Sequence, residues 1–324
     1  MSVQAVSNSD LDRLGALLTA TGPAMELRSP LTGQPMGELP TSTAADVEVG
    51  AQLARRAQAT WAARPIEERA QLLLDFHDHI LDQRDYFIDL LQSAGKARLS
   101  AAEEVLHVAL TARYYGRTAR RYLRSERGEG LVPLLTRVDR HYVPKGVVGV
   151  IGPWNYPLTM AISDGLAALV AGNAIMLKPD HQTPLVALAA VELLRSTGLP
   201  TDLWQVVHGR GAVVGRDLID VSDYVCFTGS TATGRTVATQ CARRLIGCSL
   251  ELGGKNPMVV LADADVESTA EGAVRAAFSN SGQLCVATER IYVVEPLFEP
   301  FIRAFVARTR GIRLGNAPDF DHDM

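Results

Sequence analysis

The sequence predicts an α/β protein with a doubly wound parallel sheet and a helical layer ahead of it. Three observations predict this class. Apolar residues recur three and four positions apart over residues 43–123, short β-rich and helical runs alternate over 147–245, and one candidate ligand motif follows each β-rich run. Repeated βα units form a parallel sheet with helices on both faces, and ligands bind at the carboxyl ends of its strands. We therefore expect a ligand site in the loops that follow the strands.

The first part of the chain is expected to support the sheet. Residues 25–40 predict a β-hairpin, because Pro30 and Thr32-Gly33 supply turn residues between short extended pieces. Residues 43–123 are expected to be helical with one break, at Arg64-Pro65, and to cover the sheet. The same packing role is assigned to three histidines that have no second metal ligand at a suitable spacing: His77, His79 and His107.

Residues 128–145 change in character and predict a second hairpin. Leu131 to Leu135 is apolar, and Thr136 to Val143 mixes β-branched and charged residues, so we expect two antiparallel strands. An edge strand with exposed backbone groups tends to pair with another chain unless something covers it. Two interpretations stay open: a hairpin that joins a neighbouring subunit, or a hairpin that packs within its own domain.

The alternating region predicts the sheet itself. Strands are expected at 147–151, 174–177, 203–207 and 224–227, and helices at 158–170, 184–196, 211–219 and 234–245. One motif follows each strand in turn: PWNYP, KPDH, GRG and TGS. The motifs therefore lie where a parallel sheet places its ligands.

Composition argues against several classes of function. The chain has 324 residues, 47% of them hydrophobic, and a formal net charge of −4, so nothing favours nucleic acid or an anionic membrane as a partner. The start, MSVQAVSNSD, has neither a basic nor an apolar signal region, and the longest apolar run, 166–177, is shorter than the roughly 20 residues that span a bilayer. Four cysteines without metal-ligand spacing predict free thiols, a cytoplasmic protein and no metal site.

The stretch from Leu250 to Cys285 carries the candidate chemistry. It opens with LELGGKNP and closes with FSNSGQLC, so a carboxylate, Glu251, and a thiol, Cys285, each lie near a glycine. Glycine lets the backbone approach a ligand closely. A thiolate can attack an electrophilic carbon, and a carboxylate within reach can activate the water that releases the product. The remaining cysteines are expected to be small buried hydrophobes: Cys226, Cys241 and Cys248.

Asn155, in PWNYP, supplies a side-chain amide just past the end of the first strand of the sheet. When a thiolate adds to a carbonyl carbon, the oxygen becomes an oxyanion, and a preorganised amide donor stabilises it by roughly 2.7 to 4 kcal/mol. The alternative is that Asn155 only closes a turn between Pro153 and Pro157.

Five motifs occur in the order found in the aldehyde dehydrogenase superfamily: PWNYP at 153–157, LKP at 177–179, FTGSTATG at 227–234, LELGGKNP at 250–257 and SGQLC at 281–285. The chain resembles that superfamily from about Pro30 to its last residue. It resembles in particular the NADP-dependent succinate-semialdehyde dehydrogenases, through KPDHQTP, RRLIG before LELGGKNPM, and CVATERIYV. The resemblance implies an aldehyde-dehydrogenase-like fold. It also implies an enzyme that oxidises succinate semialdehyde to succinate.

The resemblance also implies a role for each site residue. Cys285 is the nucleophile, and Asn155 holds the oxyanion together with the backbone N–H of Cys285. After hydride has left for the nicotinamide, Glu251 deprotonates the water that hydrolyses the thioester. The apolar neighbours of Glu251, Leu250 and Leu252, are expected to give it surroundings that suit a base. The dinucleotide is expected to contact Trp154, Asn155, Lys178, Pro179, Asp180, His181, Gly211, Gly229, Ser230 and Leu252.

The KPDH motif bears on the choice between NADP and NAD. In the family the lysine, here Lys178, meets the ribose, and NAD-preferring members usually carry a glutamate three positions later, where this chain has His181. A carboxylate there repels a 2′-phosphate, so its absence favours NADP. Two alternatives stay open: Asp180 could hold the ribose and keep NAD usable, and His181 could be an exposed loop residue without a role. Gly229 and Ser230 alone are a weak phosphate signal, because their motif has one glycine at the turn.

Two departures from the family pattern affect the expected function. Several succinate-semialdehyde dehydrogenases have arginines that bind the distal carboxylate of the substrate, where this chain has Ser163 and Ser279. The chain also ends at Met324, before the segment that holds the nicotinamide ribose in the family, so we expect a truncated and nearly inactive protein. The alternatives are a dehydrogenase for an aromatic or betaine-type aldehyde, and an inactive dinucleotide-binding fragment.

The resemblance finally divides the chain. Residues 1–127 are expected to form the N-terminal part of the cofactor domain, 128–146 an oligomerisation hairpin, 147–253 a Rossmann-like NAD(P)-binding domain, and 254–324 the start of an incomplete catalytic domain. It implies a homo-oligomer when the chain is full length.

Overall fold

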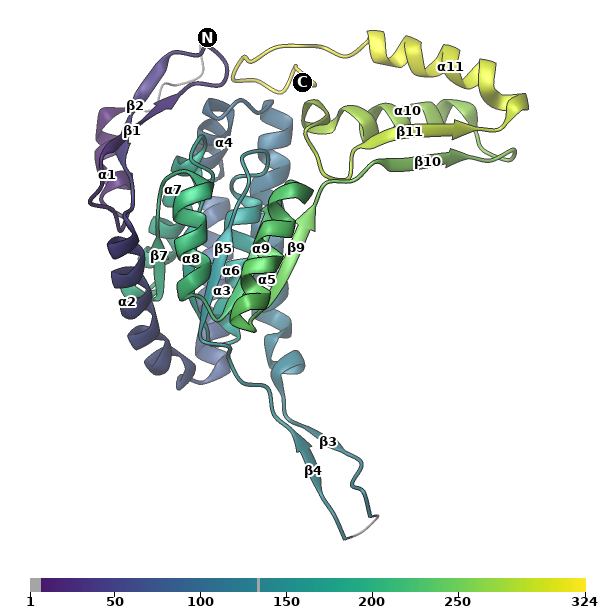
Figure 1. The fold of residues 1–324 in the computed structure, drawn as a ribbon. Helices are drawn as coiled ribbons and strands as arrows, with labels where there is room; N and C mark the ends of the chain where they lie inside the picture. Colours follow the sequence, from purple (N-terminus) through teal and green to yellow (C-terminus); the bar gives the residue numbers. More distant parts are fainter. Residues whose placement is uncertain (1–6, 133–134) are drawn as a thin grey trace.

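The computed structural model describes residues 7–132 and 135–324. A five-stranded parallel sheet lies at its centre, in the order β7-β6-β5-β8-β9, with helices on both faces (Figure 1). Its strands are β5 Val147–Ile151, β6 Ala174–Lys178, β7 Trp204–Val206, β8 Tyr224–Gly229 and β9 Gly247–Leu252. The chain moves from β5 out to β7 and then returns to β8 on the other side of β5. This is the doubly wound topology that the sequence predicts.

Burial along the strands follows from their place in the sheet. Every residue of β5 and β6 is buried, as expected for inner strands with helices on both faces. The edge strand β9 alternates between exposed and half-buried residues instead. Four strands of this sheet are predicted from the sequence, and β9, which carries Glu251, is not.

The two faces of the sheet are covered by different helices. On one face lie α6 Thr159–Val170 and α7 Pro184–Ser196, with a further layer of α3 Ile66–Asp82, α4 Arg84–Ser93 and α5 Arg98–Leu123 outside them. On the other face lie α2 Ala44–Ala62, α8 Arg216–Val221 and α9 Thr231–Arg244.

Two predicted helical regions are corrected. The region 43–123 breaks at Gln83 and again over 94–97, as well as at the predicted Arg64-Pro65, so it forms a bundle of shorter helices. Residues 211–219 form a wide turn, Gly211–Gly215, before α8 begins. Two of the histidines assigned to packing, His79 and His107, are exposed.

The N-terminal segment forms α1 Asn8–Gly15 and the predicted antiparallel hairpin, β1 Ala24–Arg28 with β2 Pro35–Pro40. The next helix, α2, begins with a capping box in which Thr43 and Asp46 bond each other's backbone N–H. Burial opposes ionisation of Asp46, but hydrogen bonds from Thr43 and Thr21 outweigh it and hold the pKa of the Asp46 carboxyl below its usual value.

The second hairpin projects from the body of the molecule (Figure 1). Its strands are β3 Glu126–Gly128 and β4 Val138–Arg140, paired antiparallel. The pairing is shorter than predicted: the described part of the apolar run 131–135 is not strand, and Pro133 and Leu134 lie outside the described residues, as do residues 1–6 of the stretch read for a signal region.

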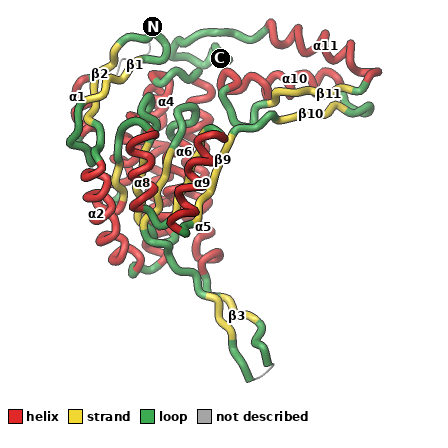
Figure 2. The backbone as a smooth tube through the Cα atoms, viewed as in Figure 1, coloured by secondary structure: helices red, strands yellow, loops and turns green. Residues whose placement is uncertain are grey.

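The chain after β9 forms a small unit of its own (Figure 2). It pairs β10 Asn256–Val260 in parallel with β11 Thr288–Val293 and packs α10 Val266–Phe278 against α11 Glu295–Arg310. Its core of Val260, Ala270, Ala273 and Phe301 is separate from the main core. None of the described helices combines the length and the apolar character that a bilayer crossing requires.

Candidate active site

The loop of Asn155 leaves the carboxyl end of β5 and leads into α6. Its first residue is tied to the neighbouring strand, because the Gly152 N–H donates to the Lys178 carbonyl at 3.0 Å. The Asn155 side chain then reaches across to the thiol loop, where its Nδ2 donates to the Gln283 carbonyl at 2.8 Å. Asn155 is half-buried, and the neighbouring Trp154 is 47% exposed.

The loop of Cys285 is shaped by three consecutive residues with positive φ: Asn280, Ser281 and Gly282, at 50°, 59° and 73°. Non-glycine residues adopt this left-handed conformation rarely, and such strain is often found at functional sites. The turn reverses the chain after α10 and leaves Cys285 exposed. Asn256, from the LELGGKNP motif, holds the far side of the loop by donating to the Cys285 carbonyl at 2.8 Å and the Ala287 carbonyl at 3.0 Å.

Tyr156 shows that the Asn155 loop and the Cys285 loop lie close together. Burial, and then the charges of Glu104, Glu103 and Cys285, raise the pKa of the Tyr156 hydroxyl to about 12. The residue next to Asn155 in the chain therefore lies within electrostatic reach of the Cys285 thiol. The structure thus brings PWNYP and SGQLC together at one end of the sheet.

Glu251 is exposed, so its expected apolar surroundings are wrong. The reason is the two-residue period of a strand, which turns neighbours to opposite faces. Leu252 lies on the face that α9 covers, where a Cβ on Gly234 would meet it at 2.5 Å. Glu251 points to the other face, toward Asp164 of α6, whose pKa is raised by burial and further by the Glu251 charge. No hydrogen bond joins Glu251 to Cys285 within the part of the chain that the structure describes.

The KPDH residues surround the end of β6. Lys178 is 3% exposed and its ammonium donates to the Pro179 carbonyl at 2.9 Å, while burial lowers the pKa of the Lys178 ammonium. Asp180 accepts from the Gln182 N–H at 2.9 Å and lies 3.4 Å from His181 Nδ1. Asp180 therefore already has partners in its own loop, and His181 is only partly exposed.

The residues predicted to bind the phosphates of the dinucleotide, Gly229 and Ser230, also have structural roles. Ser230 is the N-cap of α9, and its hydroxyl accepts from the Thr233 N–H at 3.2 Å. A Cβ on Gly229 would meet the Phe227 ring at 2.6 Å, so packing alone requires a glycine there. Gly211 has no such packing reason, because a Cβ on it would meet nothing within 4 Å. The remaining N–H groups at the start of α9 suit an anion.

Three side chains that support the two loops were not predicted from the sequence: Lys96, Glu104 and Asn280. Glu104 has a detectable signal, because helical spacing puts it on the apolar face of α5 with Ala101 and Val108. Asn280 lies inside the FSNSGQLC motif. Neither signal says which groups these side chains contact, since the partners are far away in the sequence.

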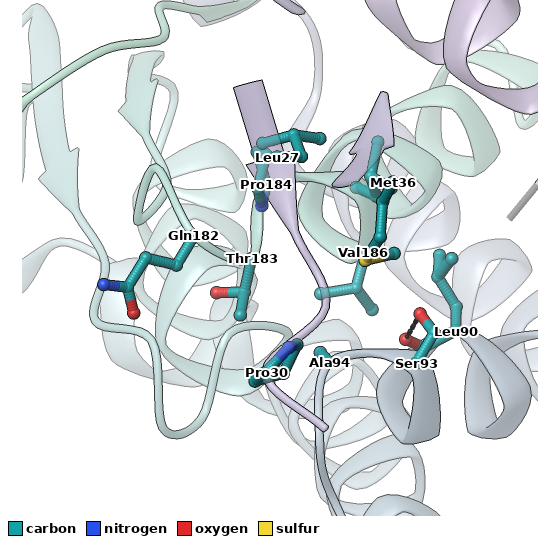
Figure 3. A pocket seen from close by; sticks show the side chains of 11 residues that line it. Leu27, Pro30, Met36, Leu90, Ser93, Ala94, Gln182, Thr183, Pro184 and Val186 are labelled. Atoms are coloured by element: carbon teal, nitrogen blue, oxygen red, sulfur yellow. Dashed lines mark hydrogen bonds between the residues drawn. The ribbon is translucent and has the colours of Figure 1, made fainter. Parts of the chain in front are cut away.

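A separate hollow lies between the β1–β2 hairpin, α4 and the start of α7 (Figure 3). Its lining includes Leu27, Met36 and Val186 and has no acid, base or thiol. It therefore offers no second catalytic centre. No group of three or more metal-ligating side chains occurs among residues 7–132 and 135–324.

Comparison with known proteins gives relatives along nearly the whole chain. Residues 18–324 match the aldehyde dehydrogenase family. A Mycobacterium tuberculosis protein named "Putative succinate-semialdehyde dehydrogenase (NADP+) 2" is 48% identical over 94% of this chain, and the Methylomonas "4,4′-diapolycopene aldehyde oxidase" is 38% identical over 90% of it. The chain spans 59% and 56% of the length of these two relatives.

Solved structures agree with the sequence relatives. An E. coli NADP-dependent enzyme superposes with a TM-score of 0.90 at 30% identity, covering 93% of this chain and 63% of that one. An NADP-dependent glyceraldehyde-3-phosphate dehydrogenase from Bacillus halodurans, complexed with NADP, superposes with a TM-score of 0.86 at 33% identity. The match covers 93% of this chain and 64% of that one. The fold, the order of the motifs and these matches show that the chain belongs to the aldehyde dehydrogenase family, as the sequence predicts.

Proposed function

We propose that this chain takes part in the NADP-dependent oxidation of an aldehyde to a carboxylic acid through a thioester on Cys285. One observation carries the proposal: the 2.8 Å hydrogen bond from Asn155 Nδ2 to the Gln283 carbonyl, which joins the proposed oxyanion donor to the loop of the proposed nucleophile. The chain spans 56% to 59% of the length of these relatives, so the proposal concerns the steps that its own residues can perform.

The exposed Cys285 thiolate attacks the aldehyde carbon, and the carbonyl oxygen becomes an oxyanion. One N–H of the Asn155 amide is held by Gln283, and the other is left to donate to that oxyanion. NADP, held by Lys178 and the N-terminus of α9, would supply the hydride acceptor for the carbon attached to Cys285. Glu251 then takes a proton from the water that attacks the thioester, and its exposed position gives that water access.

The residues at the ends of β6 and β8 suit a phosphorylated dinucleotide. The Lys178 ammonium has three N–H donors, and one of them is used by Pro179. The N-terminus of α9, a helix of 14 residues that begins after Ser230, adds a positive dipole end and free N–H groups. His181 in place of a carboxylate removes a repulsion from a 2′-phosphate, and this supports NADP over NAD.

Succinate semialdehyde is the substrate that we propose, because it is in the name of relatives with 48% and 49% identity. The two serines at the positions of the family's arginines do not replace a carboxylate clamp. Ser279 donates its hydroxyl to the Arg275 carbonyl at 2.6 Å. Ser163 is half-buried, and its buried hydroxyl has no hydrogen-bond partner among the described residues. The substrate therefore rests on overall similarity.

We further propose that the protein is a cytoplasmic homo-oligomer joined through the projecting hairpin. Apolar side chains on and beside this hairpin are strongly exposed: Leu131 by 93%, Leu135 by 84% and Val143 by 78%. Such a surface, together with the open edge of a two-stranded ribbon, suits addition to a strand of another copy.

Single-turnover acylation tests the reaction. The purified chain is mixed with NADP and succinate semialdehyde, and thioester formation is followed by mass spectrometry of the Cys285 peptide and by absorbance of the reduced cofactor. We expect Cys285 to be acylated only when NADP is present, and faster than with benzaldehyde or betaine aldehyde. Cys285→Ser is the control. Cofactor binding without acylation by any of these aldehydes would favour an inactive dinucleotide-binding fragment.

Calorimetric titration tests the cofactor preference. In His181→Glu the new carboxylate is expected to weaken NADP binding about 10-fold and to strengthen NAD binding. Gln182→Glu is the matched control, because it adds the same charge at the next, exposed position. Equal effects of the two variants on NADP would contradict the role of position 181.

A further inference from the structure

Three buried polar side chains from distant parts of the sequence meet behind the candidate site. Lys96 precedes α5, Glu104 lies on α5, and Asn280 lies in the turn before Cys285; they are 8%, 1% and 7% exposed. Lys96 Nζ lies 3.0 Å from Glu104 Oε2 and donates to Asn280 Oδ1 at 3.0 Å. The proposed reaction assigns none of them a role.

The Lys96 ammonium fixes the direction of the Asn280 amide. Because Oδ1 accepts from Lys96, Nδ2 points away from it and donates to the Asn155 and Gln283 carbonyls, each at 3.2 Å. The same Gln283 carbonyl accepts from Asn155 Nδ2. A rotated amide would place Oδ1 against two carbonyl oxygens, which repel it. The ammonium therefore selects the one orientation in which Asn280 joins the two loops.

Glu104 holds the other side of the Asn155 loop. Its Oε1 accepts from the Leu158 N–H at 2.9 Å and the Thr159 N–H at 2.8 Å, at the start of α6. The Lys96 ammonium also lies 3.7 Å from the centre of the Tyr156 ring, where a cation is attracted to the ring face. The ion pair thus contacts the Asn155 loop at Tyr156 and at the end that enters α6.

A buried ion pair is a costly way to cap a helix. Burial lowers the pKa of Lys96 and raises the pKa of Glu104, so each charge is opposed by its surroundings and supported by the other. Such pairs often add no stability over apolar residues of similar volume. A neutral N-cap would satisfy α6 alone, whereas the ion pair also reaches Asn280 and, through it, the Cys285 loop.

We propose that Lys96 and Glu104 are positioning residues that, through Asn280, aim the free amide N–H of Asn155 at the oxyanion formed on Cys285. This inference depends on the proposed function only in taking Asn155 as the oxyanion donor and Cys285 as the nucleophile. It assigns part of the helical layer to the site, where the sequence analysis gives that layer a covering role.

Two reactions of Cys285 that use neither cofactor nor aldehyde test the inference. With p-nitrophenyl acetate, Sγ bonds to the ester carbon through a tetrahedral oxyanion, and p-nitrophenolate leaves with the electrons of the broken C–O bond. With iodoacetamide, Sγ displaces iodide at a saturated carbon, and no oxyanion forms. Lys96→Met is expected to slow acylation at least about 10-fold while alkylation changes less than about 2-fold. Both rates are measured on the Cys285 peptide by mass spectrometry, with Cys285→Ser as the blank.

Companion variants separate positioning from a general effect on folding. Lys96→Arg keeps the cation and is expected to retain acylation within about 3-fold of the native chain. Asn280→Ala is expected to lose as much as Lys96→Met, and the double variant no more than either, because both act through one contact. If Lys96→Met does not fold, Glu104→Gln and Asn280→Ala carry the same test.

The outcomes distinguish this inference from the proposed function. Equal losses in acylation and alkylation, or losses that multiply in the double variant, would overturn the positioning role. If the ester assay follows the expected pattern but NADP and aldehyde fail to acylate Cys285, the positioning role stands and the proposed function falls.

Discussion

Arg69 gives the sharpest test of how the helical layer is held to the sheet. Its guanidinium is buried, with the residue 8% exposed, and it donates to three backbone carbonyls: Val170 at 3.0 Å, Ala62 at 3.0 Å and Arg64 at 2.6 Å. Ala62 and Val170 are the last residues of α2 and α6, so one cation meets the negative ends of two helices. Arg69→Met keeps most of the volume and leaves three carbonyls without this donor.

The expected loss follows from those carbonyls. The hydrogen bond to Val170 is buried, and those to Ala62 and Arg64 are part-buried. A buried acceptor that loses its donor costs about 1 kcal/mol or more and a part-buried one less, so Arg69→Met is expected to lower the free energy of unfolding by about 2 to 3 kcal/mol. Arg69→Lys keeps a charge but not the fork of donors, and about half of that loss is expected. With a urea m-value of about 3 kcal/mol/M, the Arg69→Met midpoint falls by about 0.7 to 1 M.

Urea unfolding followed by far-ultraviolet circular dichroism measures the effect. Arg120→Met is the matched control, because its side chain is 80% exposed and lies 3.4 Å from Glu67 in an exposed ion pair. Such pairs contribute about 0 to 1 kcal/mol. A loss below about 1 kcal/mol in Arg69→Met, or an equal loss in Arg120→Met, would refute the reasoning.

Three further predictions concern packing, pH and thiol reactivity. A Cβ on Gly165 would lie 2.2 Å from the Trp204 ring, so Gly165→Ala is expected to cost about 1 to 3 kcal/mol, and an unchanged melting temperature would contradict this. Asp46→Asn is expected to lower the melting temperature at pH 7. Because the pKa of Asp46 is depressed in the folded chain, its carboxylate stabilises the fold above the unfolded value of 3.8, and this stability is lost on acidification. The difference in melting temperature between Asp46→Asn and the native chain should therefore shrink as the pH falls through 3.8 and below, and a difference that stays constant with pH would speak against this. Burial raises the pKa of the Cys226 thiol to about 12, so iodoacetamide at pH 8 is expected to label Cys285 and spare Cys226, and equal labelling of the two peptides would rule this out.

The sheet could be predicted because its inner strands are short runs of mainly apolar residues. The predicted 147–151 and 184–196 coincide with β5 and α7, where every strand residue is buried and a proline begins the helix. The edge strand β9 was not predicted, since one side of it faces solvent and its residues alternate between polar and apolar. The helix breaks after α3 and α4 were not predicted either: neither has a proline, and the only local mark is Gly95 after α4, which has a φ of 96°.

The candidate site was predictable in its residue types but not in its supports. Asn155, Glu251 and Cys285 lie in motifs that can be read locally. The prediction for the surroundings of Glu251 failed because it took chain neighbours for spatial neighbours, whereas a strand sends Leu250 and Leu252 to the opposite face. The link from Lys96 to Asn280 joins positions far apart in the sequence, and no local pattern encodes it.

The contacts between the Asn155 loop and the Cys285 loop determine how a loss of Cys285 acylation in a variant should be interpreted. Asn155 and Cys285 lie in parts of the chain with separate cores: Asn155 follows β5 of the main sheet, and Cys285 lies between α10 and β11, which pack around the small core of Phe301. Three polar contacts join the two loops across these parts: Asn155 to Gln283, Asn280 to Asn155, and Lys96 to Asn280. Arg275 to Glu103 and Gln92 to Ala317 also cross between the parts, but away from the two loops. A substitution that loosens the small unit without touching Cys285 should impair the oxyanion contact before it impairs the thiol, because the thiol is already exposed whereas the amide must be aimed. Loss of acylation with intact alkylation is thus the signature of a displaced loop, and loss of both points to the thiol itself.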